Sequence, residues 1–409
     1  MVAVARLAPS VFSSRGFRQY FLGQSLSLLG DGLRTLAIPL FAYHLTHSAL
    51  STGASLACEI GPFSLFGLVG GSLADRLDRR KLMIACDAIR CAVMAGFAVA
   101  YAMHVLTMPM IYSGLVVISI AAAAFLSAQS SSIPYLVGKD RTTEAVAVLI
   151  GAENFSNLVM PTLGGALFAI FGPFPALIIN AATYFASQLS LMRIPTLGPE
   201  QIHGLPSPRQ LRADIALGFR TLLADRGMRA QAALAFGFNL FAFGGYSILI
   251  PFLKTGFAAS DREIGFFLGV TAVGAVVGTL FSTVNARRWP FGRALVIAYL
   301  IDAFLFIPVV LTHDLWLAAA CWAGSNVAAS FEIAQIIGFR LRIAPAELVG
   351  RVMGAVRLVV LGGMLPGVLV FGWIADHRSA HLAMSIMVLG FVALAVVAFC
   401  TPAVRNEAR

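Results

Sequence analysis

The side chains of this chain that could carry protons are carboxylates placed inside long apolar runs. Asp31 lies near the middle of the first run, three residues before Arg34, and Glu59 lies near the middle of the second. A charged group in lipid is costly, so it normally faces a cavity or a partner, and a change in those surroundings can load or release a proton. Asp31 and Glu59 are therefore the leading candidate proton carriers. The alternatives are a structural ion pair between Asp31 and Arg34, which share a helix face, and a Glu59 carboxyl kept neutral by a hydrogen bond.

Later apolar runs contain further polar groups. Glu153 and Glu332 are the other candidate proton carriers, and Glu332 could instead attract a cationic substrate. The candidate residues of a substrate cavity are Arg34, Asn154, Asn157, Phe236, Asn239, Phe243, Gln335 and Arg357. The aromatic side chains of the seventh run indicate a partly apolar substrate. The same side chains could equally face lipid.

The sequence predicts no metal site, no cofactor and no enzymatic activity. Its five cysteines lie scattered in apolar surroundings without a closely spaced pair, which is typical of small core residues. His44 with His47, and His377 with His381, have helical spacing, but few other ligands lie near them, so polar loop residues are the favoured interpretation. The sequence contains no phosphate-binding P-loop motif for ATP.

Membrane-spanning helices must position these side chains. Hydrophobic residues make up 59% of the 409, charged residues 12%, and the mean hydropathy is +0.85, which leaves too little polar surface for a water-soluble globule. Apolar runs of about 20 residues predict an all-α protein with twelve transmembrane helices in a lipid bilayer. Most of the 29 Lys and Arg residues fall at the termini or after even-numbered runs, so both termini are predicted to be cytoplasmic. Because these basic residues punctuate apolar runs, the net charge of +10 does not indicate nucleic-acid binding.

The chain divides into two halves of six helices. We predict an N-terminal bundle over 1–194, a cytoplasmic linker with a short amphipathic helix over 195–229, and a C-terminal bundle over 230–409. The turn that follows Gly71 recurs weakly after Gly278, as a duplicated bundle predicts. A second repeat consists of candidate helix-packing residues, Pro161, Gly164 and Gly165 in the first half and Pro366 and Gly367 in the second.

A charged turn separates the second and third runs and reads Gly71-Ser-Leu-Ala-Asp75-Arg76-Leu-Asp-Arg79-Arg80. This spacing resembles the cytoplasmic signature of the major facilitator superfamily, except that Asp78 stands where the family usually carries Gly. The resemblance implies two pseudo-symmetric six-helix bundles around a central cavity. It also implies a gate in which Asp75 faces the start of the eleventh helix while Arg76, Arg79 and Arg80 find carboxylates, for which Asp140, Glu144 and Glu347 are the candidates. An ordinary cytoplasmic loop is the alternative.

Three further stretches refine the resemblance. The opening from Phe17 to Asp31, the stretch from Leu45 to Ala49 and the stretch from Leu217 to Arg220 look like the bacterial branch that includes enterobactin exporters and macrolide efflux proteins. This resemblance implies a proton-driven exporter of a small organic molecule, such as a drug, siderophore or metabolite, that works by alternating access in the bacterial plasma (inner) membrane. We expect a monomer. The alternatives are a proton-independent facilitator or lysolipid flippase of the same fold, and a non-transporting receptor.

Overall fold

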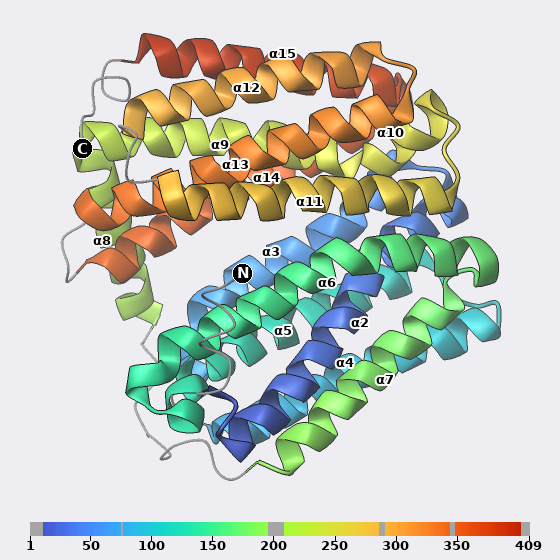
Figure 1. Ribbon diagram of the computed structural model, residues 1–409, viewed down its shortest axis with the longest axis vertical. Helices are drawn as coiled ribbons and strands as arrows, with labels where there is room; N and C mark the ends of the chain where they lie inside the picture. The colour runs from blue at the N-terminus through green and yellow to red at the C-terminus, as the bar shows by residue number, and fades with distance from the viewer. Residues whose placement is uncertain (1–10, 75–76, 195–207, 286–290, 344–347, 402–409) are drawn as a thin grey trace. The chain divides into compact units, whose positions relative to one another are not determined.

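The computed structural model describes residues 11–74, 77–194, 208–285, 291–343 and 348–401, and within these ranges the regular structure is entirely helical (Figure 1). Six long helices precede α8 among the described residues, and six follow it when α9 and α10 are taken as one bent span. This arrangement confirms the predicted all-α class. The first set comprises α2 (Arg15–Thr46), α3 (Ala49–Ala74), α4 (Arg79–Ala102), α5 (Met108–Val137), η1 (Lys139–Arg141), α6 (Thr142–Phe171) and α7 (Phe174–Met192).

The second set begins with the short helix α8 (Pro208–Ala224), in the stretch where the sequence predicts an amphipathic helix. The long helices that follow are α9 (Arg226–Ser247), α10 (Leu249–Gly256), α11 (Asp261–Asn285), α12 (Phe291–Leu311), α13 (Leu315–Ile343), α14 (Val349–His377) and α15 (Ala380–Cys400). Among the described residues, six helices are long and apolar enough to cross a membrane, and eight are if each bent pair forms one span. The chain is therefore a multi-span membrane protein.

Local sequence signals account for several helix ends and bends. The Asp78 side chain accepts hydrogen bonds from the backbone N–H groups of Arg80 (2.9 Å) and Lys81 (3.2 Å), so the residue that departs from the family signature begins α4 as its N-cap. Helix α6 bends by 41° between Thr142–Met160 and Thr162–Phe171, on either side of a proline that lacks a backbone donor. A second bend, of 48°, separates α9 from α10.

The chain packs as two compact units that do not follow the simple halves of the sequence. The first unit holds Met1–Phe41 and Cys58–Pro206, and the second holds Ala42–Ala57 and Ser207–Arg409. The turn between α2 and α3 therefore belongs to the second unit, whereas most of both helices belongs to the first. This division differs from the predicted bundles over 1–194 and 230–409.

A carboxylate at the end of α14 explains why this turn groups with the second unit. Asp376 accepts hydrogen bonds from the Ser48 hydroxyl (2.6 Å) and from the backbone N–H groups of Ala49 (2.5 Å) and Leu50 (3.1 Å). It thereby caps the N-terminus of α3, where free N–H groups and the helix dipole favour an anion. Gly372 permits the approach, since a Cβ there would lie 2.9 Å from the Leu50 Cα.

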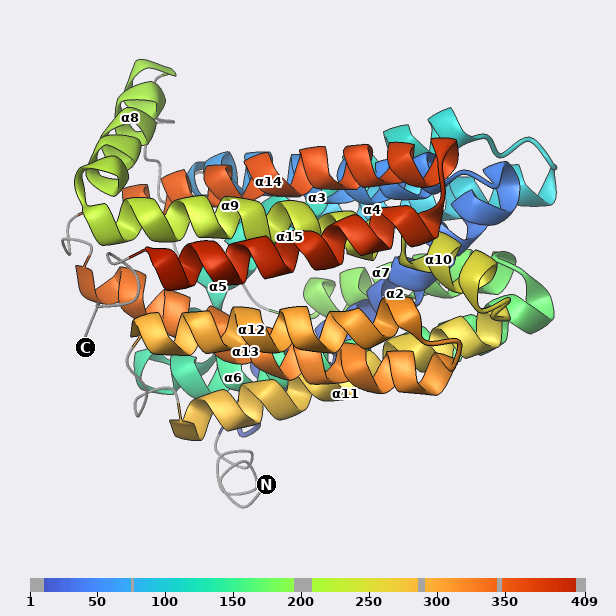
Figure 2. The same ribbon diagram turned by 90° about the horizontal axis from the view of Figure 1, so that it is seen from above.

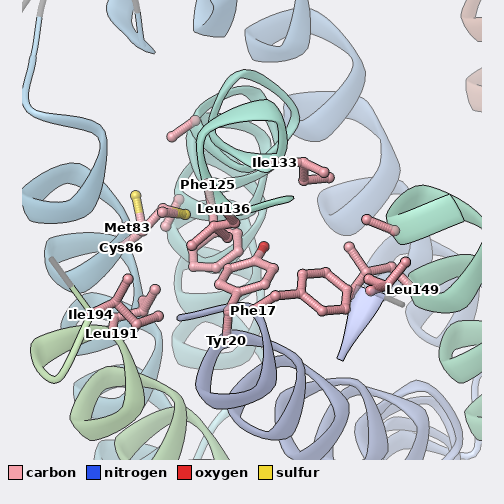
Figure 3. Close-up of a cluster of buried hydrophobic side chains, with 14 residues drawn as sticks. Phe17, Tyr20, Met83, Cys86, Phe125, Ile133, Leu136, Leu149, Leu191 and Ile194 are labelled. Carbon is pink, nitrogen blue, oxygen red and sulfur yellow. The ribbon is translucent and has the colours of Figure 1, made fainter. Parts of the chain in front are cut away.

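The core of the first unit gathers apolar side chains from α2, α4, α5, α6 and α7. Figure 3 shows Phe17 and Tyr20 of α2 pointing into a cluster with Phe125 of α5. Cys86 is buried in this cluster as a free thiol. All five cysteines are free, but Cys400 is exposed at the end of α15, so the prediction that every cysteine is a core residue is wrong for Cys400. Because lipid is as apolar as leucine, close packing stabilises such a core more than exclusion of water does.

In the second unit, glycines set the spacing between helices. Helix α9 lies alongside α14 and α15 (Figure 2). A Cβ at Gly367 of α14 would clash with the Leu240 backbone of α9, so only glycine allows this approach. Pro366 lies in the same stretch of α14.

Candidate functional site

A buried cluster of charged side chains joins three helices of the first unit. Arg34 of α2 donates from Nη2 to Oε1 of Glu59 on α3 across 2.7 Å, and its Nε lies 3.6 Å from Oδ1 of Asp31. Tyr184 of α7 donates its hydroxyl hydrogen to the same Asp31 oxygen. The Arg34 side chain is 7% exposed, whereas each carboxylate is 29% exposed. One guanidinium therefore serves two carboxylates that remain within reach of water.

Glycines on α2 make this cluster possible. A Cβ at Gly30 would lie 2.6 Å from the Asn180 Nδ2 on α7, and a Cβ at Gly32 would lie 2.6 Å from the Ser156 Oγ on α6. The two glycines flank Asp31, so α2 closely approaches both α7 and α6 where the carboxylate stands. Ser156 also donates to the Leu28 carbonyl (2.6 Å), which ties α6 to α2 at the same level.

The charge balance of the cluster leaves room for one proton. Two ionised carboxylates and one guanidinium carry a net charge of −1, and an uncompensated charge in a partly dry site is unfavourable. Arg34 Nε and Nη1 are buried without a hydrogen-bond partner among the described residues, so the guanidinium is under-satisfied on the side away from Glu59. The geometry therefore places both carboxylates within reach of the same guanidinium.

A second buried ion pair extends the network, and our sequence reasoning did not select it. Arg90 donates to Asp87, three residues earlier on α4, and both side chains are almost fully buried. The Arg90 guanidinium lies between the rings of Phe125 and Tyr184, 4.6 Å from each centroid. Tyr184 therefore contacts Arg90 with its ring and Asp31 with its hydroxyl. An Asp-x-x-Arg spacing within an apolar run was the signal that could have identified this pair.

A cavity of about 350 Å³ opens beside these groups within the first unit. Its apolar lining includes Phe63 and Phe125, and its polar lining comes from Gln24, Ser27, Asp31, Arg90, Gln129, Ser130 and Glu153. Gln24 is itself held by a hydrogen bond from its Nε2 to the Ser187 hydroxyl (3.0 Å). The cavity can accept a molecule that is partly apolar and carries hydrogen-bonding groups.

The structure brings together only some of the residues that the sequence singled out. Asp31 and Glu153 line the first-unit cavity, and Glu59 reaches the cluster through Arg34. Asn154 is half-buried on the same helix as Glu153, and the side chain of Asn157 lies outside the described residues. The other candidates, in the second unit, are Phe236, Asn239, Phe243, Glu332, Gln335 and Arg357.

These second-unit candidates occupy different surroundings. Glu332 and Gln335 on α13 are both buried, at 2% and 4% exposure. Asn239 donates to the Ala235 carbonyl of its own helix (2.7 Å), and Phe236 is 40% exposed. Phe243 lines a separate cavity.

The gate residues are only partly described. Asp75, Arg76 and Glu347 lie outside the described residues, and of Gly71 only the backbone at the end of α3 is described. Arg79 lies over the Tyr135 ring at 5.3 Å. Arg80 donates to the carbonyls of Leu191 (2.9 Å) and Met192, so its partners among the described residues are the C-terminal carbonyls of α7. The carboxylate partners expected from the resemblance stay a prediction.

The packing residues of the first half are likewise described in part. The side chain of Pro161 lies outside the described residues. Gly164 faces α2, where a Cβ would lie 3.5 Å from the Leu33 Cδ2, and Gly165 is buried. Gly164 therefore allows ordinary contact, whereas Gly30 and Gly32 allow a closer approach.

Histidines take up local partners in the second unit. His44 lies 3.1 Å from Oδ1 of Asp261, which also pairs with Lys254 at 2.6 Å. His381 contacts the Val310 carbonyl at 3.0 Å. In the part of the chain that the structure describes, no group of three or more His, Cys, Asp or Glu residues could hold a metal ion.

Comparison with known proteins agrees with this architecture. The family model described as transmembrane secretion effector matches residues 5–408. The enterobactin exporter EntS of Escherichia coli O1:K1 is 28% identical over 310 residues, which cover 75% of this chain and 72% of EntS. EntS of Shigella boydii serotype 18 has the same identity and coverage.

Solved structures share the fold. A bacterial homologue of the iron transporter ferroportin, in its inward-facing state, superposes with a TM-score of 0.76 at 16% identity, covering 94% of this chain and 98% of that one. A bacterial homologue of the human lysosomal transporter Spinster, inward-facing and unoccupied, gives 0.71 at 18% identity, covering 97% and 98%. At such identities the likeness supports the fold alone.

Proposed function

This chain belongs to the transmembrane secretion effector family of the major facilitator superfamily, and from that membership we propose that it exports a small, partly apolar organic molecule in exchange for protons. The chain is a membrane transporter and not an enzyme. The observation that carries the proposal is Arg34, shared by Asp31 and Glu59 beside a cavity. Such a cluster changes its charge when one proton arrives, which is what coupling requires.

The proton acts by redirecting Arg34. In the structure, Arg34 Nη2 lies 2.7 Å from Glu59 and Arg34 Nε lies 3.6 Å from Asp31. Protonation of Glu59 removes its negative charge, so Asp31 becomes the counter-charge of Arg34. The ion pair thereby shifts along α2, towards the Tyr184 hydroxyl and the cavity. Loss of the proton reverses the shift. Protonation of Glu59 thus lets Arg34 occupy Asp31, the cavity-facing charge, and weakens substrate binding there, so release of substrate favours uptake of the proton.

The cavity indicates the kind of substrate. Its walls combine Phe63, Phe125 and several aliphatic side chains with the polar ends of Gln24 and Gln129. A cavity of about 350 Å³ with this lining would hold one aromatic and polar part of a siderophore, drug or metabolite rather than the whole molecule, and the EntS relatives are named as exporters of enterobactin. We further propose that the protein works as a monomer in the bacterial inner membrane with both termini in the cytoplasm, in keeping with its distribution of basic residues.

The experiment is transport in proteoliposomes across an imposed pH gradient, with enterobactin and erythromycin as probes. We expect the wild-type protein to concentrate a probe against its gradient. Glu59→Gln should abolish this accumulation and still permit exchange of labelled for unlabelled probe, because Gln cannot exchange a proton. Glu263→Gln is the matched control, since Glu263 receives the Ser260 N–H (2.8 Å) at an exposed helix start and Gln can also accept there.

The alternatives give different results. Probe movement that ignores the pH gradient indicates facilitation or lipid flipping, and a Glu59→Gln variant that still concentrates probe removes Glu59 from the mechanism. Absence of flux for a broad panel of compounds favours a receptor.

A further inference from the structure

A second cavity, of about 270 Å³, lies wholly within the second unit. Helices α9, α12, α13 and α15 form it, and none of the residues that line it is basic. Its polar groups are Asp302, Ser325, Asn326 and the Tyr246 hydroxyl, and the rest of its wall is mainly aromatic. The proposed export mechanism does not use this cavity. Of the residues that line it, Phe243 alone is among the site residues predicted from the sequence.

Asp302 is an under-satisfied carboxylate at this cavity. The residue is 1% exposed, and its Oδ1 accepts one hydrogen bond, from the Ser325 hydroxyl at 2.6 Å. Its Oδ2 is buried without a hydrogen-bond partner, and no ion pair recorded among the described residues includes it. A buried carboxylate with a single neutral partner is unfavourable and attracts a proton or a cation.

The surrounding rings favour a cation. Phe306 stacks on Phe391 with 5.3 Å between centroids and meets Trp322 edge to face at 5.0 Å. Phe238 packs on the edge of Phe391 at 5.5 Å, so these rings form one continuous wall beside Asp302. Aromatic faces carry partial negative charge and attract ammonium groups, most strongly where water is excluded. An anion would find no positive partner in this lining.

We propose that this cavity binds a small primary ammonium compound with an aromatic or aliphatic body, with Asp302 as the counter-charge. The ammonium donates to Oδ2, the atom that lacks a partner, and the Ser325 hydroxyl keeps the carboxylate oriented through Oδ1. The body packs against Phe306, Trp322 and Phe391. A volume of about 270 Å³ limits the ligand to roughly one ring with a short chain, which is smaller than the usual drug-sized ligand.

Equilibrium binding to the purified full-length protein in detergent tests this site without any requirement for transport. The probes are 2-phenylethylammonium and its neutral counterpart 2-phenylethanol, measured by calorimetry. We expect saturable binding of the ammonium probe, at least about tenfold weaker in Asp302→Asn, which corresponds to about 1.4 kcal/mol. Phe243→Leu keeps an apolar wall but removes a ring, so it should weaken binding of the ammonium probe about threefold. Binding of 2-phenylethanol should change less in both variants.

The matched control is Asp314→Asn, the same substitution at an exposed helix start on α13. Asp314 caps α13 through the Trp316 N–H (2.8 Å), and Asn caps as well as Asp does, so the fold should be kept and ammonium binding unchanged. Thermal unfolding of each variant establishes that it is folded. No saturable binding to the wild type, or equal affinities in wild type and a folded Asp302→Asn variant, would overturn the proposal. Success or failure here is independent of proton-driven export, which the pH-gradient assay measures.

Discussion

Opposite charges alternate through the interior of the first unit. Glu59 pairs with Arg34, Arg34 approaches Asp31, and the Tyr184 hydroxyl links Asp31 to the ring that contacts Arg90. Arg90 then pairs with Asp87. Three carboxylates face two guanidiniums, so the chain of contacts has an excess of one negative charge. At one end of this series of contacts, the Asp31 and Glu59 side chains are partly exposed. At the other end, the Asp87 side chain is 0% exposed.

The buried ion pair of Asp87 and Arg90 should stabilise the fold. Asp87→Ala leaves the Arg90 charge buried without its partner, and removal of one member of a buried pair typically costs about 3–5 kcal/mol. We expect a large fall in the melting temperature of the detergent-solubilised protein, whereas the double variant Asp87→Leu/Arg90→Met should lose much less, because it leaves no isolated charge. Equal losses in the single and double variants would show that the pair contributes by packing rather than by charge.

Among the helices, the close approach of α2 to α7 positions the charged side chains of the cluster. Helix α2 carries Asp31 and Arg34 on one face, but their distance from Tyr184 depends on the gap between α2 and α7. Gly30 sets that gap, because any side chain there would meet Asn180. The chemistry of the cluster therefore depends on a residue that has no functional group.

Gly30→Ala tests this dependence. The added Cβ should push α2 from α7, destabilise the protein by about 1–3 kcal/mol and weaken the Tyr184 to Asp31 hydrogen bond. Gly96→Ala on α4 is the matched control, since nothing lies within 4 Å of a Cβ there. The control should be neutral or stabilising by up to about 1 kcal/mol, because alanine favours a helix. Thermal unfolding measures both, and similar melting temperatures for the two variants would contradict the role of Gly30.

The cap of α3 is a second feature of this kind. Asp376→Ala removes the acceptor of three hydrogen bonds, and loss of a helix cap typically costs about 0.5–2 kcal/mol. We expect faster hydrogen exchange at the Ala49 and Leu50 amides, measured by mass spectrometry, with unchanged exchange in the middle of α14. Asp376→Asn keeps one carbonyl acceptor, so its exchange rates at these two amides should lie between those of the wild type and those of Asp376→Ala. Unaltered exchange in Asp376→Ala would mean that Ser48, which also caps Ser51 N–H at 3.0 Å, is sufficient.

For the molecule as a whole, helices α2 and α3 belong to both units. Their outer turn, Ala42–Ala57, groups with the second unit, and the remainder of each helix groups with the first. Asp376 joins α14 to α3 at this turn, because the start of a helix favours an anion.

Asp75→Asn addresses the other end of α3, where Asp75 lies outside the described residues. If Asp75 closes a cytoplasmic gate, the variant should transport several-fold more slowly in proteoliposomes while its membrane insertion and melting temperature stay near those of the wild type. Asp314→Asn, at an exposed position just before α13, provides the comparison for charge removal at a loop. Normal turnover in Asp75→Asn would favour an ordinary loop.

Sequence reasoning succeeded where the information is local. Hydropathy and charge distribution identified a helical membrane protein of two similar halves, and the resemblance identified its family, because both depend on patterns within single segments. It also identified Asp31, Arg34 and Glu59 as ionisable groups in the first two apolar runs, with an ion pair between Asp31 and Arg34 as one alternative. The pairing of Arg34 with Glu59 could not be read from their spacing, because two helices contribute and their rotation about their axes is set by packing.

The amino-acid pattern alone established that this chain is a membrane protein, since it has too few polar residues to cover a water-soluble fold. It also established that carboxylates lie within the apolar runs. Folding in three dimensions established which of them share a guanidinium, that Asp87 and Arg90 belong to the same network, and that Asp302 faces an aromatic cavity. It also assigned the turn between α2 and α3 to the second unit. These outcomes depend on contacts between residues far apart along the chain, which helix periodicity within one segment does not encode.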